Sequence, residues 1–599
     1  MAPSKSKERK LMANLKAEYP RPQFERAAWQ CLNGQWEFEL DQGASGQARR
    51  VYEQPHLSGN INVPFCPESS LSGIGHTDYI RACWYRRDVD IPEKWLEGRV
   101  LLNFGAVYYE SAIYVNGKLA AKHVGGHASF SVDITDYAHA GTNSVAVYAY
   151  SDVRDPRQPV GKQSIAYASA GCSYTRTTGI WQSVWMEPVA NHYIGGVHIT
   201  PDAENGCVDM DIELPRGAQG TLSAAAYFKG AQAGKAECRC TGGYAHLHVE
   251  LSEKHLWDVD APELYDLKLA LTENGQTVDT VNSYFGLRDI RIQDGKVLLN
   301  GKPLYQRLVL DQGFNPEGII TSPSDEELRA DIERSQAMGF NGARMHQKVF
   351  EARFLYWADH MGYILWGEYP NWGMDISSGS AMPRFVTEWL EIMKRDWSSP
   401  ALIGWCPFNE TQLDGDAELL RAIYRMIKQA DPSRLCIDTS GWAHCGETDM
   451  FDYHDYNQDP KVFSEHCKAY GAVKPGEPFA LLSSQYPYMH GKSPEFISHG
   501  EPVFVSEFGG IGWRMPKEGE ALPENAWGYG NGPKSEQEFI ERLDGLMAAL
   551  QQAEGVWGFC YTQLTDVEQE INGLYTYDRR PKFPPEKVHE IIARKAWNE

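Results

Sequence analysis

Two glutamates follow apolar segments that have the length and composition of buried strands. Glu410 ends the segment ALIGWCPFNE, and Glu507 ends PVFVSE, directly before Phe508-Gly509-Gly510. A carboxylate at such a position is costly to bury unless it is paired with a cation or takes part in chemistry. Two carboxyl groups on separate strands could cleave a glycosidic bond, because one protonates the leaving oxygen while the other attacks the anomeric carbon or activates water. Spacing alone leaves open the alternative that each glutamate pairs with an arginine and is structural.

The second half of the chain predicts elements that would bring these glutamates together. After about residue 288, short apolar runs alternate with helical segments, as far as GVWGFCYTQL near the end. Ser324-Asp325-Glu326-Glu327 is a capping box that begins one such helix, and Phe340–Arg344 follows as a strand. About 310 residues of such repeats fit a (β/α)8 barrel, whose catalytic groups lie at the carboxyl ends of its strands.

The first half of the chain indicates β structure. Trp84–Ile91 alternates apolar and polar residues, and Ser111–Val124 contains Asn116-Gly117 between two such runs, a strong hairpin signal. Further alternating segments continue to residue 287, with the spacing that is typical of sandwiches. We therefore predict three domains, with boundaries at 1–190, 191–287 and 288–599.

Composition and charge exclude several classes of protein. The net charge of −23 disfavours binding to nucleic acid or to an anionic membrane surface. No run of 18 apolar residues predicts a membrane span, and no apolar run after the basic start Lys5–Lys10 indicates a secretory signal. The 12 cysteines show no dense spacing, as expected of reduced thiols. We expect a cytoplasmic protein that does not bind nucleic acid or membranes.

A set of segments in chain order carries a resemblance to a known family. They are Leu32–Phe38, Trp84–Arg87, Phe104–Val107, Val115–Gly117, Gly179–Trp185, Phe285–Arg288, Leu299–Pro303, Met338–Arg344, Asn409-Glu410 and Ser506–Gly509. Together they resemble glycoside hydrolase family 2, which includes β-galactosidases and β-glucuronidases. The resemblance implies a jelly-roll-like β-sandwich, an immunoglobulin-like β-sandwich and a catalytic (β/α)8 TIM barrel, in a compact three-domain form without a cofactor.

The same resemblance assigns roles to the two glutamates. Glu410 would be the general acid/base and Glu507 the nucleophile of a mechanism that retains anomeric configuration. Their carboxyl groups should then lie about 5–5.5 Å apart, with Glu410 protonated and Glu507 ionised in the resting enzyme. Asn409 would bind the sugar 2-hydroxyl, although a strand-end cap is its structural alternative.

Other strand ends supply candidates for sugar binding. Arg344 could equally orient a catalytic carboxylate, and one of Trp557 and Tyr561 should lie under the sugar while the other belongs to the core. Glu368 matches a position that binds magnesium in β-galactosidases, but Tyr369-Pro370 follows without the neighbouring ligand pattern, so we predict no metal. The full set of predicted substrate-binding residues is Asp311, Arg344, His346, Lys348, Glu368, Asn409, His454, Tyr456, Trp557 and Tyr561.

The identity of the sugar is less well determined. β-Glucuronidases of the family carry Asn-x-Lys before a segment similar to Gly573–Thr576, and here Glu570-Ile571-Asn572 stands in that place. This favours a neutral hexose, unless Lys348 or Arg579 supplies the missing cation. We predict a retaining exo-β-glycosidase, β-galactosidase-like, that acts on a small glycoside or oligosaccharide. The alternatives are a β-glucuronidase, β-galacturonidase, other β-hexosidase or α-L-arabinopyranosidase, a transglycosylase, or more remotely a non-catalytic carbohydrate-binding protein. Whether the chain forms a homo-oligomer stays open.

Overall fold

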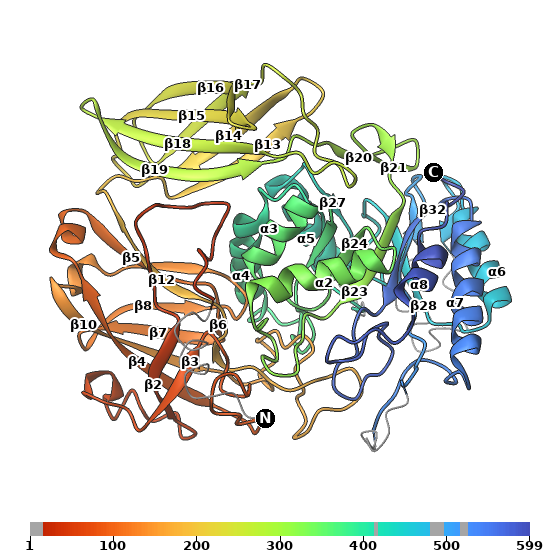
Figure 1. The fold of residues 1–599 in the computed structure, drawn as a ribbon, viewed down its shortest axis with the longest axis horizontal. Coiled ribbons are helices and arrows are strands. Elements are labelled where there is room, and N and C mark those ends of the chain that lie inside the picture. The colour runs from red at the N-terminus through yellow and green to blue at the C-terminus, as the bar shows by residue number, and fades with distance from the viewer. Residues whose placement is uncertain (1–15, 412–416, 480–495, 516–524) are drawn as a thin grey trace.

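The computed structural model describes residues 16–411, 417–479, 496–515 and 525–599. Two groups of antiparallel strands and one parallel barrel make up the molecule. In Figure 1 the first group lies at the lower left, the second lies across the top, and the barrel with its helices fills the right.

The first group of strands forms a sandwich of two antiparallel sheets. The alternation of Trp84–Ile91 falls within β4, and Asn116-Gly117 joins β7 to β8 with both φ angles positive, as a type I′ hairpin turn requires. One sheet has the order β3-β2-β4-β10-β7-β8 and the other β1-β12-β5-β9. The bounds are β1 Gln30–Cys31, β2 Gly34–Leu40, β3 Gly59–Val63, β4 Ala82–Ile91, β5 Arg99–Phe104, β7 Glu110–Val115, β8 Lys118–Val124, β9 Phe130–Asp133, β10 Gly141–Tyr150 and β12 Val184–Val189, with a small pair β6 Val107–Tyr108 and β11 Gly179–Ile180.

The second group forms a smaller sandwich of three and four strands. Its alternation is regular: in the last strand of the smaller sheet every second residue is buried, including Leu247 and Val249. The sheet orders are β13-β14-β17 and β16-β15-β18-β19. The bounds are β13 Gly196–Asp202, β14 Cys207–Glu213, β15 Gly220–Phe228, β16 Ala231–Cys240, β17 Tyr244–Glu250, β18 Tyr265–Glu273 and β19 Gln276–Phe285. A three-stranded sheet of β20 Ile290–Gln293, β21 Lys296–Leu299 and β22 Lys302–Pro303 leads into the barrel.

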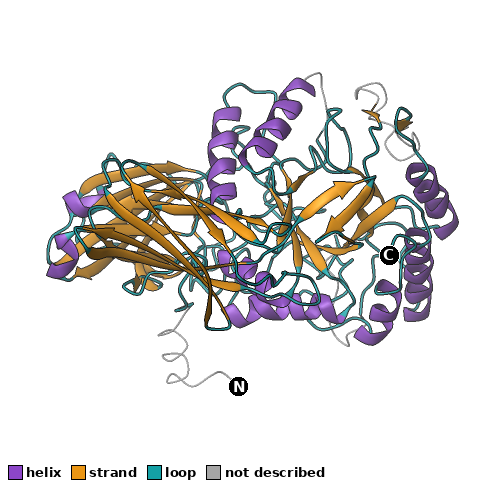
Figure 2. Ribbon diagram, turned by 90° about the horizontal axis from the view of Figure 1, so that it is seen from above, coloured by secondary structure: helices purple, strands orange, loops and turns teal. Residues whose placement is uncertain are grey.

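Eight parallel strands with helices outside them form the barrel (Figure 2). Its first strand pairs with its last, β23 with β32, so the sheet curls back on itself. The strand bounds are β23 Gln306–Asp311, β24 Gly342–Met345, β25 Ile364–Glu368, β26 Leu402–Cys406, β27 Leu435–Cys436, β28 Phe451–Asp455, β31 Val503–Gly509 and β32 Val556–Thr562. The helices are α2 Asp325–Ala337, α3 Ala352–Met361, α4 Met382–Asp396, α5 Ala417–Ala430, α6 Pro460–Gly471, α7 Glu536–Gln551 and α8 Pro585–Ile592, and a short hairpin pairs β29 Pro478–Phe479 with β30 Phe496–Ile497.

The predicted fold class, two β-sandwiches followed by a TIM barrel, is confirmed by this architecture. The Ser324 half of the predicted capping box forms, because its hydroxyl accepts a hydrogen bond from the Glu327 backbone N–H at 3.2 Å and begins α2, whereas the Glu327 carboxylate accepts from Arg334 at 2.6 Å. The domain boundaries at residues 190 and 287 stay predictions.

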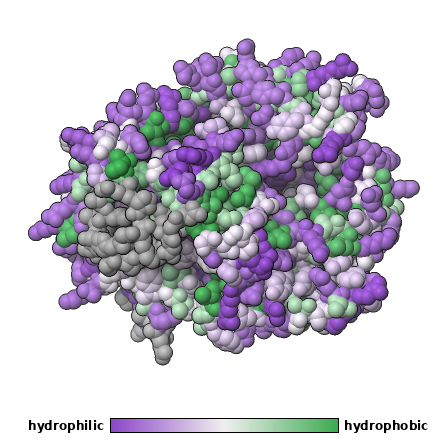
Figure 3. Space-filling view, turned by 180° about the vertical axis from the view of Figure 1, so that it is seen from behind, coloured by the Kyte–Doolittle hydropathy of each residue, from purple (hydrophilic) through white to green (hydrophobic). Residues whose placement is uncertain are grey.

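Hydrophilic residues dominate the face shown in Figure 3, in keeping with the acidic composition. Within the described part of the chain, every helix is too short or too polar to traverse a lipid bilayer. All 12 cysteines are free thiols, and most of them are buried.

A buried arginine joins the two sandwiches. The Arg26 guanidinium donates to Glu187 of β12 at 2.9 Å and to Asp279 of β19 at 3.0 and 3.1 Å, and Arg26 is only 5% exposed. A further bond reaches the Ile194 carbonyl at 2.6 Å, in the segment between the sandwiches. One cation therefore neutralises a carboxylate from each sandwich.

Replacement of Arg26 by methionine should destabilise the protein, because it leaves two buried carboxylates without their cation. We expect a loss of about 3–5 kcal/mol, measured by calorimetry as a lower temperature for the first unfolding transition. The matched control is Lys229→Met, which removes an exposed ion pair with Glu263 and should leave that transition unchanged. Equal transitions in both variants would contradict the structural role of Arg26.

Candidate active site

The two glutamates lie together at the carboxyl edge of the barrel. Glu507 belongs to β31 and pairs in register with His454 of β28. Glu410 follows β26, and its backbone N–H donates to the Ser440 carbonyl at 2.8 Å. The φ angle of Glu410 is +44°, a left-handed conformation that non-glycine residues rarely adopt and that is concentrated at functional sites.

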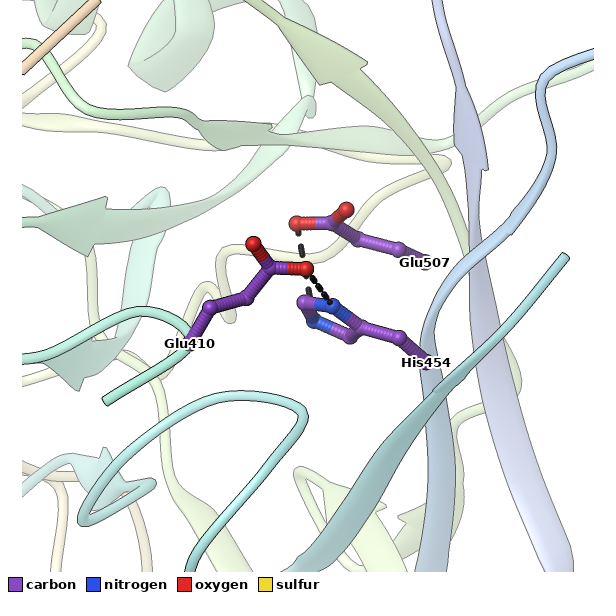
Figure 4. Close-up of side chains that lie close together, drawn as sticks. All are labelled: Glu410, His454 and Glu507. Atoms are coloured by element: carbon purple, nitrogen blue, oxygen red, sulfur yellow. Dashed lines mark hydrogen bonds and ion pairs between the residues drawn. The ribbon is translucent and has the colours of Figure 1, made fainter. Parts of the chain in front are cut away.

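His454 lies between the two carboxylates, as Figure 4 shows. Its Nδ1 is 2.8 Å from Glu410 Oε1, and its Nε2 is 3.5 Å from Glu507 Oε1. Burial lowers the pKa of the imidazole, but the charges of Glu507 and Glu410 outweigh this effect and raise it above its usual value. His454 therefore carries a positive charge more readily than an ordinary histidine and holds both carboxylates close to it.

Arg344 of β24 bonds to residues of β25 and β31 and to the residue Asn409 after β26. Its Nη1 donates to Glu507 at 2.8 Å, its Nε donates to Glu368 at 2.6 Å, and its Nη2 donates to the Asn409 side-chain oxygen. The side chain is 2% exposed, and the charges of Glu368 and Glu507 overcome burial and raise the pKa of the guanidinium well above its usual range. Arg344 thus orients the carboxylate of Glu507.

Glu507 is held in its ionised form. Burial raises the pKa of its carboxyl group, but His454 and Arg344 more than reverse this and lower the pKa to about 2. The Tyr456 hydroxyl donates a further hydrogen bond to Oε2. An anion with these partners is available as a nucleophile across the whole neutral pH range.

Several predicted binding residues surround this centre. Asn409 directs its oxygen to Arg344, while its buried amide nitrogen has no partner among the described residues and remains available for a substrate oxygen. His346 Nδ1 lies 3.0 Å from Glu368 without a hydrogen bond, and burial together with Lys162 lowers the pKa of His346 well below its usual value. Both Glu368 oxygens are occupied, by Arg344 and by the Gln347 backbone N–H, so Glu368 supports the site from behind.

Asp311 and Lys348 both have local partners after β23, and their predicted sugar-binding roles stay predictions. The Lys348 ammonium donates to the carbonyl oxygens of Gly313 and Ile320, both at 2.7 Å, and Asp311 accepts from the Gly313 N–H at 2.8 Å. Both residues therefore fix the segment after β23, and none of their contacts in the described chain reaches the catalytic carboxylates. Lys348 lies beyond the end of β24 at Met345, so the alternation of a strand does not determine the direction of its side chain.

The two aromatic residues of β32 lie at different heights in the barrel. Trp557 stands next to the amino end of the strand, whereas Tyr561 pairs in register with Phe508, directly after Glu507. Both side chains are buried in the barrel core, and the prediction that one of them lies under the sugar stays a prediction. Tyr561 is fully buried and packs against Gly509, and its hydroxyl has no partner among the described residues.

Sequence reasoning missed a contribution from the first sandwich. The segment between β10 and β11, residues 151–178, crosses to the barrel, where the Val160 N–H donates to the Trp372 carbonyl at 2.7 Å and the Tyr174 hydroxyl donates to Glu570 at 2.5 Å. It places the Lys162 ammonium 4.0 Å from the centre of the Trp372 ring, whose indole N–H donates to the Asn409 carbonyl at 3.2 Å. Its length was the available signal, because irregular segments longer than about 15 residues are usually functional.

One group within the described chain could hold a metal ion. It consists of Glu410, His454 and Glu507, whose ligand atoms all lie within 4.8 Å of one another. A divalent cation there would occupy both carboxylates and leave neither free for proton transfer or nucleophilic attack. The arrangement fits a hydrogen-bonded catalytic centre better than a resident metal site.

We expect extensive dialysis against EDTA to leave the turnover of a cleaved substrate unchanged, because the carboxylates would act without a metal. Added Zn²⁺ should inhibit reversibly by binding this group. Loss of turnover on dialysis, with recovery when one divalent cation is restored, would show that a metal is required.

Comparisons with known proteins identify two domains that precede the barrel. The family model of glycosyl hydrolases family 2, sugar binding domain, matches residues 70–184, and the model of glycosyl hydrolases family 2 matches residues 192–288. The chain therefore carries two domains of glycosyl hydrolases family 2 within residues 70–288, and together with the named relatives they indicate an O-glycosyl hydrolase.

Relatives with assigned names are distant in sequence. A β-glucuronidase of Paenibacillus borealis is 24% identical over 92% of this chain and 94% of that protein. A β-galactosidase of Thermoanaerobacter pseudethanolicus is 23% identical over 73% of this chain and 58% of that protein. A relative from Formosa agariphila is 25% identical over 59% of this chain, and the chain spans only 44% of that protein's length.

Solved structures show the same fold. The β-glucuronidase from Ruminococcus gnavus in complex with D-glucuronic acid superposes with a TM-score of 0.77. The superposition covers 97% of this chain and 100% of that one at 18% sequence identity. The likeness extends over both sandwiches and the barrel.

Tyr456→Phe should weaken the nucleophile, because it removes a hydrogen bond to the Glu507 anion. The pKa of Glu507 should rise, so the acidic limb of the kcat/KM pH profile should move to higher pH, and turnover should fall about 10- to 100-fold. Tyr424→Phe, on the outer helix α5, is the control and should keep the profile of the unmodified enzyme. An unshifted acidic limb in Tyr456→Phe would remove this hydrogen bond from the mechanism.

Proposed function

We propose that the protein is a retaining exo-β-glycosidase in which Glu410 is the general acid/base and Glu507 the nucleophile. The observation that carries this proposal is the short separation of the two carboxylates around His454, within 4.8 Å between ligand atoms. Retaining enzymes keep their carboxyl groups about 5–5.5 Å apart, whereas inverting enzymes need about 6.5–9.5 Å to admit a water molecule. The low pKa of Glu507 supports its role as the attacking anion.

The mechanism follows from these positions. Glu410 donates a proton to the glycosidic oxygen while Glu507 attacks the anomeric carbon, which forms a glycosyl-enzyme and releases the alcohol. Glu410 then removes a proton from water, which attacks the same carbon and frees Glu507. The unpartnered amide of Asn409 is placed to donate to a sugar hydroxyl, where a strengthened bond would stabilise the transition state.

For the sugar, we propose a β-uronide as the first candidate. The relatives support it, because most of them are named as β-glucuronidases. A β-galactoside is the second candidate, supported by the Thermoanaerobacter relative and by Glu570 and Asn572 standing where the family's glucuronidases carry Asn-x-Lys. The release of terminal sugars from small glycosides or oligosaccharides fits either choice.

We also propose a cytoplasmic location, supported by the 12 free thiols, which are typical of a reducing compartment. A homo-oligomer stays a prediction, and size-exclusion chromatography with light scattering would determine it.

The mechanism predicts different azide products for two variants. Glu507→Ala should lose turnover of 4-nitrophenyl glycosides, and azide should restore it by direct attack to give the inverted α-glycosyl azide. Glu410→Ala should slow cleavage by about 10²–10⁴-fold for poor leaving groups, and azide should trap the glycosyl-enzyme as the retained β-glycosyl azide. Product configuration by NMR measures both outcomes.

The substrate panel should contain β-glucuronide, β-galacturonide, β-glucoside, β-galactoside, β-mannoside and α-L-arabinopyranoside. Cleavage of none of them, with both variants indistinguishable from the unmodified enzyme, would contradict the proposed glycosidase. Identical azide products from the two variants would contradict the separate roles of the glutamates.

A further inference from the structure

The segment of residues 151–178 closes one side of the sugar site from another domain. The backbone N–H groups of Val160 and Gly161 both donate to the Trp372 carbonyl, which anchors the start of the segment to the barrel. Farther along, the Thr175 N–H donates to Glu568 at 2.9 Å, and Gln569 donates to the Gly171 carbonyl at 2.6 Å. The segment is thus fixed at both ends against the loops after β25 and β32.

This segment buries a lysine in the site. Lys162 is 6% exposed, and its ammonium lies 4.0 Å above the centre of the Trp372 ring. Within the described chain no carboxylate oxygen lies within 4.0 Å of this ammonium, and no hydrogen bond from it is found. A buried ammonium without a contacting anion is costly, so an anion that binds next to it would gain a strong charge-assisted interaction.

The surroundings of Lys162 identify the space that it faces. Burial lowers the pKa of its ammonium, but the surrounding acidic groups, Glu507 and Glu410 among them, outweigh this effect and raise it. The ammonium is therefore charged at neutral pH and lies within electrostatic reach of both catalytic carboxylates. The Trp372 ring beneath it lies 6.3 Å from the His346 ring, and its indole N–H donates to the Asn409 carbonyl at 3.2 Å, so Lys162 stands beside the residues that surround Glu507.

The cations considered from the sequence are already engaged. Lys348 is bound by two carbonyl oxygens, and Arg579 donates to the carbonyl oxygens of Phe314 and Tyr577. Asn572 donates to Glu570 at 3.0 Å, so it holds that carboxylate and supplies no positive charge. Among the described residues of this region, Lys162 is a buried cation from which no hydrogen bond is found.

We propose that Lys162 is a specificity-determining residue whose ammonium binds the carboxylate of a β-linked uronic acid, an inference that rests on the glycosidase function proposed above. The cation comes from the first sandwich and takes the place of the lysine absent at Asn572. Both Glu570 oxygens already accept hydrogen bonds, from Tyr174 and Asn572, which fixes this carboxylate to the wall of the site. Burial raises the pKa of Glu570, which favours its neutral form and reduces repulsion of a second carboxylate.

The test compares substrates that differ only at C6. Lys162→Met keeps an apolar side chain over Trp372 but removes the charge. Its kcat/KM is compared for two pairs of 4-nitrophenyl substrates: β-glucuronide with β-glucoside, and β-galacturonide with β-galactoside. We expect kcat/KM for the cleaved uronide to fall about 10- to 100-fold, while the neutral partner changes less than about threefold. Lys229→Met, on the surface of the second sandwich, is the control and should change neither ratio.

Equal losses of kcat/KM for the uronide and for its neutral partner in Lys162→Met would overturn the inference. It would also be overturned if the unmodified enzyme cleaves only neutral glycosides and Lys162→Met keeps the same preference. Either result leaves the proposed glycosidase standing. If the unmodified enzyme cleaves none of the glycosides in the panel, the proposed function fails. Calorimetric titration with D-glucuronate, D-galacturonate and their neutral hexoses then still tests the role of Lys162. Uronate binding that disappears in Lys162→Met would support the inference, and the absence of uronate binding would overturn it.

Discussion

The buried guanidinium of Arg344 is the constraint on which the catalytic centre depends. One planar cation bonds simultaneously to residues of β25 and β31 and to Asn409 after β26, so it determines how these strand ends are spaced. Its charge also offsets the burial of Glu507, which would otherwise favour the protonated form of that carboxyl group. Glu507 can remain an anion in a nearly dry site because Arg344 and His454 are both present. The same contacts that stabilise the barrel edge therefore also prepare the nucleophile.

The parts that could be predicted from the sequence are those that follow from local patterns. Apolar runs that end in Glu410 and Glu507 indicated strand ends, and the barrel places such ends on one side of the molecule. The hairpin at Asn116-Gly117 and the cap at Ser324 depend on only a few neighbouring residues, and both formed. Such features are predictable because backbone sterics and nearby hydrogen bonds decide them.

The partners of side chains were not predictable where a residue lies outside the regular period of a strand. His346 and Lys348 are two residues apart, as on one face of a strand, but β24 ends at Met345 and Gln347 has a φ angle of +49°. The turn separates their directions, so His346 lies beside Glu368 while Lys348 binds the carbonyl oxygens after β23. Asp311 has the expected position at a strand end, yet its carboxylate accepts from a local N–H. A strand end indicates where a residue lies but does not determine the partner of its side chain.

The position of Lys162 beside the barrel could not be predicted from local sequence patterns, for a different reason. No periodic or capping signal connects this residue to the barrel, because the contact forms only when two separately encoded domains pack together. This division has a functional consequence. In the proposed mechanism the barrel supplies the two carboxylates that break the bond, and these groups would act on any β-linked sugar that reaches them. A cation carried by the neighbouring sandwich can then be changed without disturbing Arg344 or His454, so substrate preference and bond cleavage depend on different parts of the chain.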